Sequence, residues 1–243
     1  MTSARLDPDA RAGLRLTLLL AGVAALVAVV LPLAVLVRDG WAPLAALDRD
    51  LGSSAHQLVL RHDSLLRAAQ VLTNLGAPVL VELVGVVIAC VLLARGYRRS
   101  ALYLVVCIGG GYLLSTLGKV AVDRARPVFT QTVDQASGKA FPSGHATGAA
   151  TFWLSLAVLA APRLTRRRRR ALLVIAVLLG LLVALTRVLL GVHYPTDVTA
   201  GLLLGWGWVA ACTAVFVTWR SEEGRPGAAL ASDVDPAAAA AGR

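Results

Sequence analysis

Two histidines stand next to residue types that activate an imidazole or bind an anion. The first, His193, comes two residues before Pro195 and four before Asp197. Because proline suits the first position of a helix, we expect His193 just before a helix and Asp197 in its first turn. The carboxylate can then hold one imidazole nitrogen and leave the other free as a nucleophile.

The second histidine, His145, ends the sequence Phe-Pro-Ser-Gly-His, which favours anion binding. Ser143 can cap the N-terminus of a following helix. Gly144 lets an anion approach the backbone closely, and the free amides of the first turn lie at the positive end of the helix dipole. We therefore expect a phosphate-binding turn with an imidazole at its edge.

Three cations accompany these clusters. Lys119 and Arg126 are seven residues apart, so they share a face if the helix that contains Lys119 continues until Pro127 ends it. Arg187 ends the apolar segment that precedes His193. Each feature alone has an ordinary explanation: a cation that snorkels, a turn, or a hydrogen-bonded His–Asp pair. Their combination indicates one catalytic phosphate site.

The composition predicts which elements position these residues. The chain has 243 residues, of which 57% are hydrophobic and 16% charged, and its mean hydropathy is +0.71. Soluble domains carry about 25% charged residues. The same composition excludes a disordered or collagen-like chain. We predict an all-α integral membrane protein.

Six segments approach the length of about 20 apolar residues that a transmembrane helix needs. They are Leu14–Val37, Ala77–Ala94, Ala101–Gly118, Ala146–Ala161, Ala171–Leu190 and Val198–Trp219. The first is too long for the core of a signal peptide. Residues 1–220 are interpreted as one six-helix transmembrane domain, and residues 221–243, polar and then Ala-rich, as a disordered tail.

Residues 40–76 lie between the first two segments. Their apolar positions indicate an amphipathic helix on the membrane surface: Leu58, Leu65, Leu66, Ala69 and Leu72. His56 and His62 belong to this helix, where a hydrated histidine needs no function. The cysteines Cys90, Cys107 and Cys212 are interpreted as small buried hydrophobic residues, with neither a disulfide nor a zinc site.

The distribution of basic residues predicts the orientation. The net charge is +10, and most of the 24 Lys and Arg residues lie in the segments that are inside when the N-terminus is inside. The positive-inside rule therefore places both termini in the cytoplasm and the three clusters at the outer face. The run Arg166–Arg170 is interpreted as a cytoplasmic loop rather than a nucleic-acid-binding patch, so no nucleic acid is expected as a partner.

The three clusters resemble the signatures of the type-2 phosphatidic acid phosphatase superfamily. Its Lys-x6-Arg-Pro signature matches Lys119 to Pro127, and Pro-Ser-Gly-His matches residues 142–145. The third signature, Ser-Arg-x5-His-x3-Asp, matches up to Asp197, but Thr186 replaces its serine. The resemblance covers the core of residues 119–197, whereas the N-terminal half is similar only in hydropathy.

This resemblance implies a metal-independent membrane phosphatase with a phosphohistidine intermediate. In it, His193 attacks phosphorus and is oriented by Asp197, while His145 protonates the leaving oxygen and then assists water. The phosphate ligands implied are Lys119, Arg126, Ser143, Gly144 and Arg187. Neither a metal nor another cofactor is expected, because fixed cations replace the metal. Only Asp197 and Asp123 supply carboxylates in the three motif cores, too few for a two-magnesium site.

The substrate implied is a lipid phosphate or a polyprenyl diphosphate in a cell membrane, with a bacterial plasma membrane expected. Bacterial members of this size include undecaprenyl-diphosphate phosphatases, which favours that substrate and a role in cell-wall lipid metabolism. The polar segment Val128–Ala140 is a candidate lid. Glu82 lies inside an apolar segment, and it is either a partner of a site arginine or a hydrated carboxylate.

Three alternatives remain open. A non-catalytic lipid- or anion-binding membrane protein of the same fold would need the cations but not His145, His193 and Asp197. The vanadate-dependent haloperoxidases have similar motifs, but they are soluble. A transporter would be expected to show an inverted repeat or a pair of broken helices.

Overall fold

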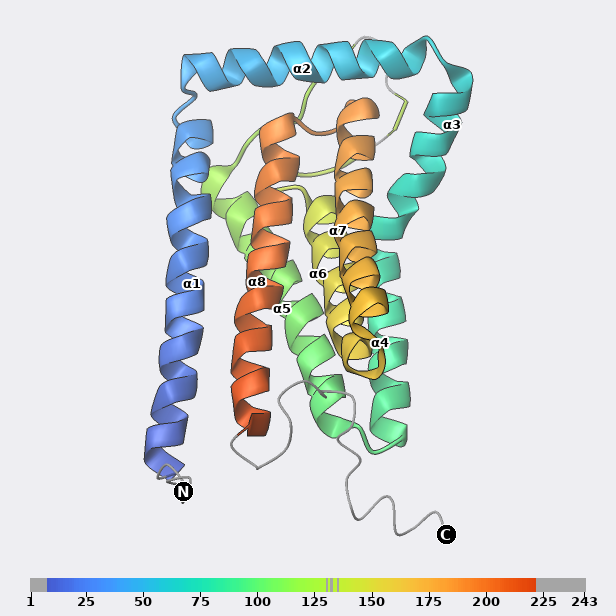
Figure 1. The fold of residues 1–243 in the computed structure, drawn as a ribbon. Coiled ribbons are helices and arrows are strands. Elements are labelled where there is room, and N and C mark those ends of the chain that lie inside the picture. Colours follow the sequence, from blue (N-terminus) through green and yellow to red (C-terminus); the bar gives the residue numbers. More distant parts are fainter. Residues whose placement is uncertain (1–7, 130, 132, 135, 222–243) are drawn as a thin grey trace.

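The computed structural model describes residues 8–221 except 130, 132 and 135, and within these residues it is helical, without strands (Figure 1). Eight α-helices and two 3-10 helices follow one another along the chain. They are α1 (Pro8–Arg38), α2 (Ala42–Leu60), α3 (Asp63–Leu72), η1 (Thr73–Gly76), α4 (Pro78–Ala94), α5 (Arg98–Val122), α6 (Gly144–Ala160), η2 (Ala161–Arg163), α7 (Arg166–Leu189) and α8 (Pro195–Ser221).

Six of the eight described α-helices lie on the six predicted segments, in the same order. Five spans are long and apolar enough to cross a membrane: α1, α5, α6 together with η2, α7 and α8. The sixth, α4, qualifies only together with α3 and η1, to which it is joined at a bend of 42°. Large apolar side chains such as Val79 and Leu83 face outward, 78% and 61% exposed. A surface of this kind requires lipid, so the chain is a multi-pass membrane protein.

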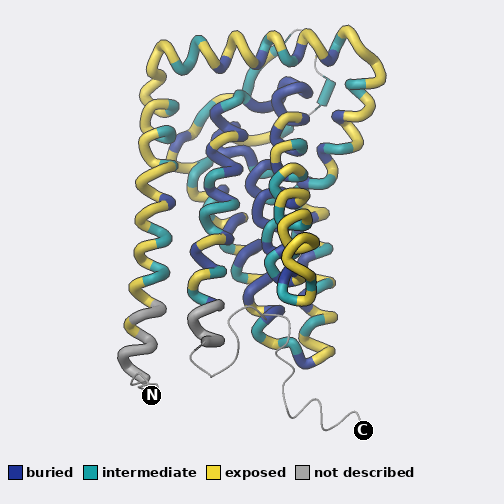
Figure 2. The backbone as a smooth tube through the Cα atoms, in the orientation of Figure 1, coloured by how far each residue is buried: buried dark blue, intermediate teal, exposed yellow. Residues whose placement is uncertain are grey.

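The centre of the bundle is formed by α6 and α8, as the buried positions in Figure 2 show. Glycines bring these two helices close together. A Cβ on Gly205 would lie 2.6 Å from the Cβ of Ala150, and one on Gly201 would lie 2.7 Å from the Ser143 carbonyl. The start of α8 is therefore fixed against the start of α6, which sets the two histidine motifs side by side.

The region between α1 and α4 differs from the single surface helix that was predicted. Figure 1 shows α2 crossing the upper ends of α1, α8 and α7, whereas α3 turns back along the bundle toward α4. His56 is 3% exposed, so the prediction of a hydrated histidine is wrong for it, but His62 is exposed. The helix α2 thus covers one end of the bundle.

Two smaller predictions are corrected as well, and a third lies almost entirely outside the described residues. The arginine run is not a loop, because Arg166–Arg170 form the exposed beginning of α7. Cys107 and Cys212 are buried as predicted, but Cys90 is exposed on α4. Of the predicted disordered tail, only Ser221, the last residue of α8, lies within the described residues.

Candidate active site

His193 lies in the tight connection between α7 and α8. Gly191, with φ of +73°, reverses the chain after α7, and Pro195 begins α8. Asp197 is then in the first turn of α8, as predicted. Its Oδ2 accepts a hydrogen bond from the Tyr194 amide at 2.8 Å and lies 3.5 Å from His193 Nδ1. Both His193 and Asp197 are buried, so this pair has a fixed geometry.

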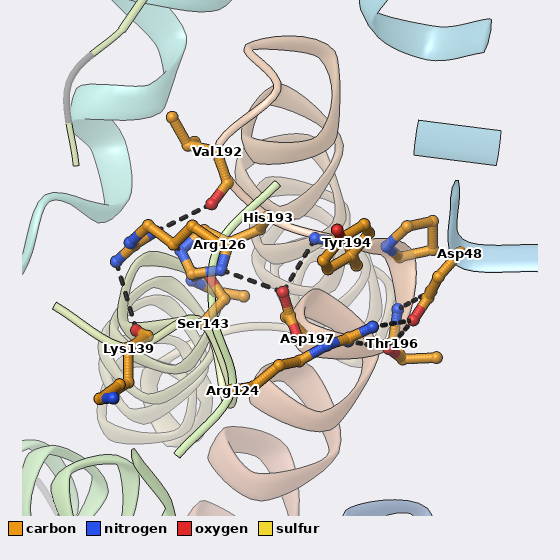
Figure 3. A network of polar contacts seen from close by, with 12 residues as sticks. Asp48, Arg124, Arg126, Lys139, Ser143, Val192, His193, Tyr194, Thr196 and Asp197 are labelled. Atoms are coloured by element: carbon orange, nitrogen blue, oxygen red, sulfur yellow. Dashed lines mark hydrogen bonds and ion pairs between the residues drawn. The ribbon is translucent and has the colours of Figure 1, made fainter. Parts of the chain in front are cut away.

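The other nitrogen of His193 faces Arg126. Nη1 of Arg126 is 2.9 Å from His193 Nε2 (Figure 3). A guanidinium can only donate hydrogen bonds, so Nε2 must be the accepting nitrogen, and the proton of the neutral ring is on Nδ1 beside Asp197. This tautomer leaves the lone pair of Nε2 directed into the site.

The surroundings of His193 also keep it uncharged. Burial lowers its pKa from 6.5 to about 4; the Asp197 carboxylate acts in the opposite direction, and Arg126 and Arg187 add to the lowering. Burial disfavours the charged form because imidazolium loses its hydration. A neutral imidazole near pH 7 is the form that can attack an electrophile.

The beginning of α6 forms the turn that was predicted for phosphate. Ser143 is the N-cap, and its hydroxyl accepts from the Ala146 amide at 3.5 Å. The Ser143 amide donates to the Asp197 carbonyl at 3.0 Å, which ties the turn to α8. A Cβ on Gly144 would lie 3.4 Å from Nζ of Lys119. Glycine therefore leaves room between the α6 amides and the lysine.

Lys119 and Arg126 reach the site by different routes, so the prediction that they share a helix face is wrong. The helix α5 ends at Val122 rather than at Pro127, and Asp123 adopts the left-handed conformation with φ of +54°. Aspartate tolerates this conformation better than most residues. Arg126 is therefore held by the loop, where it donates to the carbonyls of Ser137, Gly138, Lys139 and Val192.

The third cation, Arg187, lies in the last turn of α7 and is 2% exposed. Its Nη1 donates to Thr73 Oγ1 and to Asp134 Oδ2, both at 2.9 Å. Its Nε is buried and has no hydrogen-bond partner among the described residues. The neighbouring Thr186, which replaces the family's serine, donates its hydroxyl to the carbonyl of Val183 within α7.

Arg124, Asp48 and Thr196 extend the site and were missed by the sequence analysis. Nη1 of Arg124 donates to Asp197 Oδ1, and Nη2 donates to Asp48 Oδ2, each at 2.7 Å (Figure 3). The Thr196 hydroxyl also donates to Asp48. Burial acts to lower the pKa of Arg124, but the two carboxylates outweigh it and raise the pKa. In the sequence, Asp48 resembles a hydrated carboxylate of an amphipathic helix, and nothing local links it to Arg124.

The segment Val128–Ala140 lies beside these residues, although residues 130, 132 and 135 of it are outside the described part. Besides Asp134, its contacts include the Phe129 ring, which stacks on His56 with centroids 4.5 Å apart. The two nitrogens of His56 lie 3.0 and 2.9 Å from the carbonyls of Leu189 and Gln131. His56 thus links α2, the end of α7 and this segment.

The predicted residues therefore converge. His145, in the first turn of α6, interacts electrostatically with Arg187, His193, Arg126 and Lys119. Glu82 does not join them through an ion pair: within the described part of the chain it pairs with no arginine, although it lines a hollow together with Lys119. Three cations, a helix N-terminus and two imidazoles suit a tetrahedral anion that is attacked by Nε2.

Comparisons with known proteins agree with this chemistry. A sequence model of the PAP2 superfamily matches residues 100–221. The chain is 39% identical over 112 residues to a lipid A 1-phosphatase of Rhizobium etli, covering 42% of this chain and 44% of that protein. It is 34% identical over 113 residues to phosphatidylglycerophosphatase B of Bacillus subtilis, covering 45% and 55%.

A third relative is the decaprenylphosphoryl-5-phosphoribose phosphatase of Mycobacterium tuberculosis, 35% identical over 113 residues that cover 44% of this chain and 58% of that protein. The chain thus matches about half the length of these curated relatives. Its fold is similar to the crystal structure of a transmembrane PAP2-type phosphatidylglycerolphosphate phosphatase from Bacillus subtilis. The TM-score is 0.71 at 25% identity, over 79% of this chain and 94% of that one.

Proposed function

Because the chain belongs to the PAP2 superfamily, we propose that it hydrolyses the phosphate of a membrane lipid through a phosphohistidine at His193. The observation that supports this most strongly is the protonation state and tautomer of His193. Nδ1 faces Asp197, and Nε2 accepts from Arg126, so the ring is neutral and its lone pair faces the cations. A site that only binds an anion gains nothing from an uncharged imidazole in this position.

In the first step, the phosphate binds between the α6 amides, Lys119 and Arg187, and Arg126 exchanges contacts with Nε2 for contacts with phosphate oxygens. Nε2 of His193 attacks phosphorus, and the bond between phosphorus and the lipid oxygen breaks. His145 takes up a proton as the negative phosphate binds beside it, and gives that proton to the leaving oxygen. Asp197 stabilises the positive charge that the phosphorylated ring carries at Nδ1–H.

In the second step, water loses a proton to His145 and its oxygen attacks phosphorus. The bond between phosphorus and Nε2 breaks, inorganic phosphate leaves, and His193 returns to its neutral form. The cations and amides stabilise the charge on the equatorial oxygens in both steps, and one such donor commonly contributes about 3–4 kcal/mol. The residues supply every charge these steps require, so the proposed reaction needs no metal.

The substrate we propose is a lipid phosphate or a polyprenyl diphosphate that is hydrolysed at the outer face of a bacterial plasma membrane. The relatives named for lipid A, phosphatidylglycerophosphate and decaprenylphosphoryl-phosphoribose support a lipid substrate. The orientation is supported by the arginine-rich start of α7, which lies at the end of the bundle opposite α2 (Figure 1). By the positive-inside rule, that end is cytoplasmic.

The proposal is tested by phosphate release from the purified protein in detergent with EDTA present. The substrates are phosphatidic acid, phosphatidylglycerophosphate and undecaprenyl diphosphate, each assayed with the wild type and with His193→Ala. We expect metal-independent release by the wild type and loss of it in the variant. Equal release by both proteins would remove the proposed nucleophile. Release by neither would favour the alternative, a non-catalytic lipid- or anion-binding membrane protein.

A further inference from the structure

A hollow with a few polar side chains in a mostly apolar lining lies between α4, α5 and α6, beside the phosphate-binding turn. It has a cavity volume of about 50 Å³, and it reaches Lys119 and Gly144 at the site. Tyr112 and Thr116, both exposed on α5, line it as well. The hollow is therefore open toward the side of the bundle, where the body of a lipid substrate would be. A volume of this size admits a small group such as a hydroxyl, since a single water needs about 10–15 Å³.

Ser115 contributes a buried hydroxyl to the lining of this hollow. The residue is 4% exposed, and its Oγ has no hydrogen bond to any described residue. Hydroxyls in helices usually donate to a carbonyl one turn earlier, as Thr116 does to Tyr112. A Cβ built on Gly144 would lie 4.0 Å from Ser115 Oγ and 3.4 Å from Lys119 Nζ. The Ser115 hydroxyl and the Lys119 ammonium therefore lie near the same position, beside Gly144.

Glu82 supplies a carboxylate to the same hollow. It is half-buried within α4, it lines the hollow, and it forms no ion pair with any residue in the described part of the chain. Ionisable groups inside membrane helices are costly, and they usually mark a functional site. A carboxylate accepts hydrogen bonds and repels anions, so it selects for a neutral donor rather than for a second phosphate.

We propose that this hollow is a subsite for a hydroxyl group on the lipid, next to the carbon that carries the phosphate. A hydroxyl can accept from Ser115 and donate to Glu82 at the same time, whereas an ester or an alkyl chain cannot donate, and a diphosphate brings a negative charge. The inference rests on the proposed phosphatase activity. It narrows the substrates to lipid phosphates whose leaving group carries a free hydroxyl.

The test compares two lipids that differ by one hydroxyl: 1-oleoyl-lysophosphatidic acid and its 2-deoxy analogue. We expect the wild type to favour the hydroxylated lipid in kcat/KM by roughly tenfold or more, because a site built to bond a hydroxyl discriminates against its absence. In Ser115→Ala and in Glu82→Leu, the ratio of the two kcat/KM values should fall to within about twofold of one. The control is Ser155→Ala on α6, whose buried hydroxyl donates to the Phe152 carbonyl, and it should keep the wild-type ratio.

The outcomes separate the two proposals. Equal kcat/KM for both lipids in the wild type would overturn the subsite, and so would an unchanged preference in both variants. Neither result would contradict the proposed lipid phosphatase activity. If the proposed function is wrong, the wild type will release phosphate from neither lipid. That result would contradict both the phosphatase activity and the hydroxyl subsite. Thermal unfolding of each variant in detergent establishes that the measured protein is folded.

Discussion

The two sides of the site differ in how completely their charges are paired. Around Asp197, both carboxylate oxygens have partners, since Arg124 binds one and the Tyr194 amide binds the other. Around the cations, the contacts are exchangeable: Arg187 is bound by Asp134 of the neighbouring segment, and Lys119 has no ion pair within the described part of the chain. The difference indicates a carboxylate side that is organised in advance and a cation side that exchanges protein contacts for phosphate.

The largest effect is expected on the organised side. Asp197→Asn should lower kcat by about three to four orders of magnitude, because an amide nitrogen facing Nδ1 disfavours the tautomer with a free Nε2. Steady-state phosphate release measures it. Asp123→Asn is the matched control, because Asp123 is 68% exposed and pairs only with Lys139 among the described residues. A small loss in Asp197→Asn would show that the tautomer is set by something other than this carboxylate.

Arg124→Ala should also cause a large loss, because it leaves the carboxylates of Asp48 and Asp197 without their shared cation. Breaking a buried ion pair costs about 3–5 kcal/mol. Thermal unfolding in detergent should show this destabilisation, and kcat should fall more than KM rises, because Arg124 binds Asp197 and not substrate. Adding Asp48→Asn should recover part of the lost stability by removing one uncompensated charge. Strictly additive effects of the two substitutions would contradict the coupling.

A smaller and opposite effect is expected on the cation side. Asp134→Asn weakens the contact that phosphate must displace from Arg187, so KM should fall by roughly three- to tenfold while kcat changes little. Titration of initial rates against substrate measures both constants. Asp50→Asn, at an exposed position of α2, provides the control. A raised KM in Asp134→Asn would mean that this carboxylate helps to bind the substrate instead of competing with it.

A further effect concerns the dependence of stability on pH. The pKa of His193 is lowered to about 4 by burial, so between pH 6.5 and 4 the unfolded chain binds a proton there that the folded protein does not. The free energy of unfolding therefore decreases as the pH is lowered across this window, by roughly 2–3 kcal/mol in total. Melting curves at pH 7 and pH 4.5 should show a smaller loss for His193→Gln than for the wild type. Equal losses would mean that His193 is not held neutral by the fold.

The sequence predicted the motif residues well, because their signals are local. A proline followed by Asp197 in the first turn, and a serine cap before Gly144, depend only on neighbouring residues, and both arrangements are present. The resemblance to the superfamily, drawn from the three motifs, is confirmed by the family match. The transmembrane helices were also predictable, since apolar length is a property of each segment alone.

What the sequence did not predict depends on contacts between distant segments. Asp123, in the left-handed conformation, ends α5 early. The position of Arg126 is therefore determined by a loop and not by the period of a helix. Asp48 and His56 have the spacing of an ordinary amphipathic helix, and only the passage of α2 across the bundle brings them to Arg124 and to the segment beside the site. Tertiary pairing of this kind leaves no periodic pattern in the chain.

The most direct test of the account is to trap the covalent intermediate. The protein in detergent is mixed with a phosphorus-labelled lipid phosphate, quenched in alkali within one turnover, and digested for mass spectrometry. We predict an acid-labile, alkali-stable phosphate on the peptide that contains His193, absent in His193→Ala. Phosphate release by the wild type with no label on this peptide, or with turnover retained in His193→Ala, would contradict the account.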